Sequence, residues 1–298
     1  MKFIQRNFGL LLLISCLIGL MVPSVGDHTP LIVMLSLAFI IFCSFFQINF
    51  SPESLFNDFG ISIKFWMLRY VVIPAVIFFA FKWISDFYAP VLLLSFLLPA
   101  AVSSPSFAAL FGGKPDLSLK VLVYSSFLSV ITIPYLMTLF LGSSIELETG
   151  KMLLTLVYTI VVPFIVHLPL RKIKKVKEIS GRYNALFTLI GLSTIFVVVT
   201  ARNKPAILGN PGLVALFAVV SLAIYTLMYL SGFFLFPSHP LAIRKTFSIS
   251  SGANNIGLGV TITALFFPGE MNIFFIVSQL AWVVMLIPIR RMFKRLDV

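Results

Sequence analysis

Charge is scarce in this sequence. Of 298 residues, 22 are Lys or Arg and 10 are Asp or Glu, whereas 59% are hydrophobic. A composition this apolar lies outside the range of soluble globular domains and is typical of integral membrane proteins. The apolar residues form long stretches and show no ten-residue alternation, so they predict an all-α membrane protein rather than a barrel.

Cysteine is nearly absent as well. Cys16 and Cys43 both lie inside apolar runs, which argues against a disulfide scaffold or a cysteine-based metal site. Leu13 to Cys16 resembles a lipoprotein cleavage site behind a basic start, so a removed signal is one interpretation. Because the apolar run continues to Val22, we interpret it as a first membrane span.

Acidic residues are absent from the deep parts of the predicted spans. Proton relays and many cation sites depend on an intramembrane carboxylate, and Glu270, beside a Pro-Gly turn, is the one candidate for a turn that dips inward. All ten acidic residues lie in connections or tails, namely Asp27, Glu53, Asp58, Asp86, Asp116, Glu146, Glu148, Glu178, Glu270 and Asp297.

Enzyme motifs are missing too. The sequence has no His-Glu-x-x-His zinc pattern and no paired aspartates of the kind that bind a diphosphate through magnesium. His167 is the one membrane base available to a serine hydrolase, and its depth is unfavourable. We therefore expect no enzyme, no cofactor and no metal, with sodium ions left open.

Ten apolar windows of about twenty residues predict ten membrane spans. They lie near residues 8–25, 31–50, 63–81, 88–112, 117–141, 152–170, 183–201, 211–236, 246–267 and 270–289.

Basic residues are unevenly divided between the two sides of these spans. One side carries only Lys82, Lys151, Arg202 and Lys204, and the remaining connection and tail residues lie on the side of both termini. The positive-inside rule then places both termini in the cytoplasm, in a plasma (inner) membrane.

Arg69 falls within the third span, and we expect it to snorkel to the cytoplasmic interface. The net charge of +12 is explained by this bias, so nucleic acid is not an expected partner and membrane lipid is.

The chain divides into two sets of five spans. Residues 143–151 form a polar hinge between residues 1–142 and 152–298. An odd number of spans in each half gives the halves opposite orientations, which is the topology of an inverted repeat.

Two polar interruptions lie at matching places in these halves. They are Ser103-Ser104-Pro105-Ser106 in the fourth span and Ser250 to Asn255 in the ninth. In hydrocarbon, helix-breaking polar residues persist where they are buried in protein or line a cavity. Matching interruptions in two related halves indicate the binding site of a transporter.

The adjacent carboxamides of Asn254 and Asn255 are the sharpest of these signals. They offer carbonyl oxygens for a cation and donors for an anion, and a helix that begins just after them directs its positive dipole end toward the break. A kink that neighbouring helices satisfy is the alternative. We predict substrate contacts from Ser103, Ser104, Ser106, Asn254 and Asn255.

Further neutral polar residues are candidates for binding an ion. Span five presents Ser125, Ser126 and Ser129 mostly on one helical face, although helix packing explains such residues equally well. Gln279 in span ten is either a cavity wall or an interhelical hydrogen bond. The predicted ion-binding set is Ser125, Ser126, Ser129, Ser250, Ser251, Asn254 and Gln279.

Residues 250–258 resemble the ninth-span motif of the bile acid/sodium symporter family. That motif runs Glu, any residue, Gly, any residue, Gln-Asn, two small or apolar residues, then Leu. Gly252, Asn255 and Leu258 match it, Asn254 replaces Gln, and Ser250 stands where the family usually has Glu.

The fourth span resembles the same family. Pro99, the serines of the interruption and residues 113–119 are similar to a segment of Pro, small residues, Ser-Asn and a Lys-Gly-Asp turn. Pro105 stands where Asn is expected. The middle of the chain also looks like the related auxin efflux carriers, so the resemblance extends to a shared superfamily.

The resemblance implies a panel domain and a core domain, with the fourth and ninth spans broken and crossing near the midplane. Sodium ions then lie behind the crossing and an organic anion in front, and the missing Glu leaves sodium coupling open. We expect a secondary active transporter of a small organic anion. The alternatives are an uncoupled or proton-linked carrier and a membrane sensor that binds ligand without moving it. The substrate, the direction of transport and the choice between monomer and homodimer do not follow from the sequence.

Overall fold

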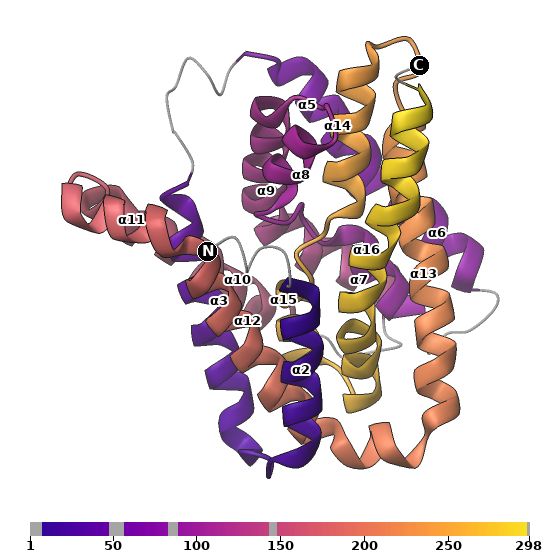
Figure 1. Cartoon of the computed structure of the whole chain (residues 1–298). Coiled ribbons are helices and arrows are strands. Elements are labelled where there is room, and N and C mark those ends of the chain that lie inside the picture. Colours follow the sequence, from indigo (N-terminus) through magenta and orange to yellow (C-terminus); the bar gives the residue numbers. More distant parts are fainter. Residues whose placement is uncertain (1–7, 48–56, 83–88, 143–147, 297–298) are drawn as a thin grey trace. The chain divides into compact units, whose positions relative to one another are not determined.

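The computed structural model describes residues 8–47, 57–82, 89–142 and 148–296, and its regular elements are helices (Figure 1). The one exception in this part of the chain is an isolated antiparallel bridge between Ala100 and Asn254. Within the described residues, seven helices are long and apolar enough to cross a membrane. The protein is therefore an all-α integral membrane protein, as the composition predicts.

The helices follow the predicted apolar windows. Among the described residues, five windows each coincide with a single helix of 17 residues or more: α3 (Thr29–Phe45), α9 (Pro115–Leu141), α12 (Lys174–Gly209), α13 (Pro211–Phe234) and α16 (Gly269–Leu296). The first window contains the shorter α2 (Phe8–Met21), which the 3₁₀ turn η1 (Gly26–His28) separates from α3.

Two windows contain a π-helical turn between α-helical segments. In the third window, η2 (Leu68–Val72) joins α5 (Phe59–Met67) to α6 (Ile73–Lys82). In the sixth, η4 (Val157–Val161) joins α10 (Thr149–Leu156) to α11 (Val162–Leu170). Such turns inside α-helices are frequent at functional sites, and η2 contains Arg69.

The fourth and ninth windows are each split into two helices. In the fourth, α7 (Ala89–Leu97) ends before Pro99, and α8 (Ser104–Leu110) begins with Pro105 in its first turn, where a missing N–H costs nothing. In the ninth, α14 (Leu241–Gly252) ends before two poor helix formers, Asn254 and Asn255, and α15 (Ile256–Phe266) follows them. We call residues 98–103 and 253–255 the paired breaks.

The helices group into two compact units, and each unit takes segments from both halves of the sequence. The first unit comprises residues 1–49, 148–217 and 257–280, and α12 packs there along α2 and α3 (Figure 1). The second comprises residues 50–147, 218–256 and 281–298, and α9 contacts α5, α7, α8 and α14 there. Both paired breaks belong to the second unit.

In the first unit, α2 packs closely on α12 at Gly19, and a substitution there tests this contact. A Cβ atom at Gly19 would lie 2.7 Å from the Cβ of Thr200 and 2.7 Å from the carbonyl oxygen of Val197. Because a backbone carbonyl cannot move aside cheaply, Gly19→Ala is expected to cost about 1–3 kcal/mol. The thermal midpoint of the purified protein in detergent measures this loss. Gly150→Ala is the control, since nothing lies within 4 Å of a Cβ there, and equal midpoints for the two variants would contradict the prediction.

Candidate functional site

The two breaks are joined to each other by backbone hydrogen bonds. The N–H of Ala101 donates to the carbonyl of Ala253 at 2.6 Å, and the N–H of Asn255 donates to the carbonyl of Pro99 at 2.9 Å. Each break therefore supplies hydrogen-bond partners for backbone groups of the other break that have no partner within their own helix. Irregular backbone inside a membrane protein needs such partners.

Asn254 fastens the second break to the end of α7. Its side chain is 2% exposed, and its amide nitrogen donates to the carbonyl of Ser95 at 2.8 Å and contacts the sulfur of Met228 at 3.3 Å. Its Oδ1 atom is buried and makes no hydrogen bond to the described residues. A buried acceptor without a partner is uncommon in native structures, so Oδ1 is a candidate ligand atom.

The position of the Arg69 side chain differs most from the sequence-based expectation. The side chain is 0% exposed, so the predicted snorkelling to the interface is wrong. Its Nε donates to Oγ of Ser251, Nη1 donates to the carbonyl of Phe96 at 2.8 Å, and Nη2 donates to the carbonyl of Ser251 at 2.8 Å. The guanidinium thus holds the last turns of α7 and α14 together.

Aromatic side chains enclose this guanidinium. Its Cζ lies 4.9 Å from the ring centroid of Tyr70 and 5.3 Å from that of Phe96. The hydroxyl of Tyr70 is itself buried and donates to the carbonyl of Ser250 at 2.9 Å. Arg69 and Tyr70 therefore bind adjacent carbonyls at the end of α14. Sequence reasoning did not include either in the site, although an arginine inside an apolar span was a usable signal.

Serine hydroxyls from α9 bond to α8, to α14 and to the first break. Oγ of Ser118 lies 2.9 Å from Oγ of Ser250 and donates to Oγ of Ser104 at 3.3 Å. Oγ of Ser125 accepts from the N–H of Ala100 at 3.2 Å. All four of these serines are fully or nearly fully buried, so the region between α8, α9 and α14 contains a network of neutral oxygen atoms. Ser118 was not among the predicted site residues.

The other predicted residues have different surroundings. Ser103 and Asn255 are partly exposed and Ser106 is exposed. Oγ of Ser129 donates to the carbonyl of Ser126 at 2.7 Å, within its own helix. Gln279 is 4% exposed and belongs to the first unit.

The described residues contain no cluster of three or more His, Cys, Asp or Glu side chains that would hold a metal ion. The donors gathered at the paired breaks are hydroxyl, carboxamide and carbonyl oxygens. Such oxygens can coordinate a hard monovalent cation, and they can also form hydrogen bonds with a polar substrate.

Paired breaks in membrane helices, with polar groups gathered around them, are typical of secondary transporters. A sequence model of the Sodium Bile acid symporter family matches residues 37–210, more than half of the chain. The chain belongs to this family of membrane transport proteins. The match includes Arg69 and the first break. A search of curated proteins gave no significant match.

Proposed function

We propose that this protein is a secondary active transporter that carries an organic anion across the membrane by alternating access. The hydrogen-bonded pairing of the two breaks carries the proposal, because broken helices that meet in this way supply the substrate site of many transporters. Membership of the Sodium Bile acid symporter family supports it independently.

The substrate site consists of Ser103, Ser104, Ser106, Asn254 and Asn255. Oδ1 of Asn254 is buried without a partner among the described residues, and α15 begins at the residue after Asn255. The N-terminal end of α15 therefore directs its positive dipole toward this break, which favours a carboxylate or another anionic group.

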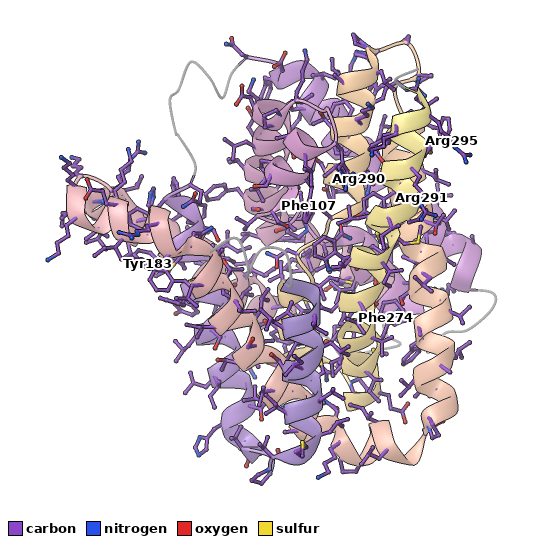
Figure 2. All side chains as sticks on the ribbon, viewed as in Figure 1. Phe107, Tyr183, Phe274, Arg290, Arg291 and Arg295 are labelled. Carbon is purple, nitrogen blue, oxygen red and sulfur yellow. The ribbon has the colours of Figure 1, made fainter. Side chains whose placement is uncertain are left out.

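The membrane topology follows from the distribution of charge. In this proposal, ten spans form an inverted repeat of residues 1–142 and 152–298, with both termini in the cytoplasm. The hinge predicted at 143–151 lies partly outside the described residues. The proposed orientation counts Arg290, Arg291 and Arg295, which lie in the last turns of α16 (Figure 2), among the cytoplasmic basic residues.

Counterflow in proteoliposomes tests the transport function and the site together. Purified protein is reconstituted, loaded with unlabelled cholate or one of a panel of smaller carboxylates, and supplied with the labelled compound outside. We expect labelled anion to accumulate, and we expect Asn254→Ala combined with Asn255→Ala to reduce its uptake roughly tenfold or more, through lost hydrogen bonds.

Thr194→Ala is the matched control. Its hydroxyl is exposed and donates to the carbonyl of Ile190 within α12, so uptake should be unchanged. Full uptake by the double asparagine variant would refute the site assignment. Specific binding of the anions without counterflow of any of them would instead identify a sensor that does not transport.

A further inference from the structure

Arg69 binds the C-terminal ends of two broken helices at once. Phe96 and Ser251 are each the residue before the last in α7 and α14, and the guanidinium takes both of their carbonyls. The last carbonyls of a helix lack partners within the helix and carry roughly half a negative charge at its C-terminal end. Two converging ends therefore hold about one negative charge.

The guanidinium supplies one positive charge in the same place. Among the described residues the ion pairs are Lys120 with Asp58, Lys151 with Glu148 and Lys174 with Glu178, so none of them includes Arg69. A buried arginine stays protonated in proteins. Its charge is thus balanced by the two helix ends and by Oγ of Ser251, rather than by a described carboxylate.

These oxygens are the kind of atoms that hold sodium in a transporter. Half-helix C-terminal ends and unwound carbonyls coordinate the coupling cation in proteins with broken helices. Here Arg69 occupies the carbonyls of Phe96 and Ser251 and the hydroxyl of Ser251. A sodium ion at the same oxygens would need to displace the guanidinium, and one close beside it would meet strong repulsion in a region of low dielectric.

We propose that Arg69 is a built-in cation that takes the place of sodium at the ends of α7 and α14, so that ligand binding and transport by this chain are independent of sodium. The claim that transport is independent of sodium rests on the proposed function. The claim that Arg69 occupies the cation position is about the folded protein alone and is tested without a substrate.

Thermal unfolding in detergent tests the cation position. The wild-type midpoint is measured in NaCl, KCl and choline chloride at equal ionic strength, and we expect no difference among them. Arg69→Ala is expected to unfold roughly 5 °C or more below the wild type. Millimolar methylguanidinium should restore part of this loss by binding the vacated carbonyls, in a saturable manner.

Lys64→Ala is the matched control for a lost positive charge on the same span, because Lys64 is exposed. Its midpoint should respond to none of these cations. A saturable rise of the wild-type midpoint in sodium over potassium would overturn the proposal, and so would a folded Arg69→Ala protein that methylguanidinium does not stabilise. If Arg69→Ala does not fold, the sodium comparison on the wild type decides.

Cholate counterflow with sodium or potassium on both sides tests the consequence for transport. Equal rates support the proposal, and sodium-dependent rates overturn it. Absence of flux in every salt counts against the transport function, and in that case the thermal experiment still decides whether Arg69 holds the cation position.

Discussion

Arg69→Lys is expected to destabilise the protein by about 2–5 kcal/mol, even though it preserves the positive charge. The guanidinium reaches three acceptors on Phe96 and Ser251 through three different nitrogen atoms. A lysine has a single ammonium on a flexible stem and cannot reproduce this fork. At least one buried carbonyl then loses its partner, and each such loss costs about 1–3 kcal/mol.

The thermal midpoint in detergent measures this effect. Arg291→Lys is the control, because Arg291 is exposed and belongs to the same unit as Arg69, so its replacement should leave the midpoint unchanged. A stable Arg69→Lys protein would show that charge alone, and not the geometry of the guanidinium, holds the two helix ends. The lysine variant should remain indifferent to sodium, since its ammonium still supplies the charge.

Gly232→Ala is expected to produce the second large loss of stability. A Cβ at Gly232 in α13 would collide with the carbonyl oxygen of Phe247 and would lie 2.6 Å from the Cβ of Ser251. Both atoms belong to α14, so this helix would be pushed away from α13. We expect a cost of about 3 kcal/mol, at the upper end of the range for an overpacked core.

The same variant should disturb the site, because α14 carries the residues that Arg69 binds. Oγ of Ser251 donates to the carbonyl of Met228 in α13 at 2.6 Å, and a displaced α14 cannot keep this bond. Gly60→Ala is the control, since a Cβ there meets nothing within 4 Å and alanine favours a helix over glycine. A Gly232→Ala protein with the same thermal midpoint as the wild type would contradict the close approach of α13 and α14.

The positions of the helix breaks were predictable from sequence because their cause is local. Proline fixes its own backbone angle and restricts the residue before it, and adjacent asparagines are poor helix formers. The structure breaks the fourth window at residues 98–103, mostly before the predicted interruption, since Ser104 to Ser106 are helical in α8. It breaks the ninth window at 253–255, the last part of the predicted interruption, since Ser250 to Gly252 still belong to α14. That the first break bonds to the second was not derivable from composition, since it depends on packing between distant segments.

Arg69 was misjudged for a related reason. Near the end of a span, an arginine beside water and an arginine beside a buried helix end have the same sequence context. The outcome depends on whether unpaired carbonyls lie within reach, and those carbonyls belong to Phe96 and Ser251, which are far along the chain. Ser118 was overlooked in the same way, because its role depends on its contacts with Ser104 and Ser250.

The π-helical turn η2 has a consequence for how related chains are compared. A π turn closes its hydrogen bonds over five residues where an α turn closes them over four, so it holds about one extra residue. Arg69 and Tyr70 both lie in this turn and both reach the end of α14. Loss of a single residue from the turn would rotate the following segment by about 100° relative to the preceding one. Alignments with family members whose third span is purely α-helical should therefore contain a one-residue gap in this turn. Without that gap, Arg69 would be aligned with the wrong residue of the other chain.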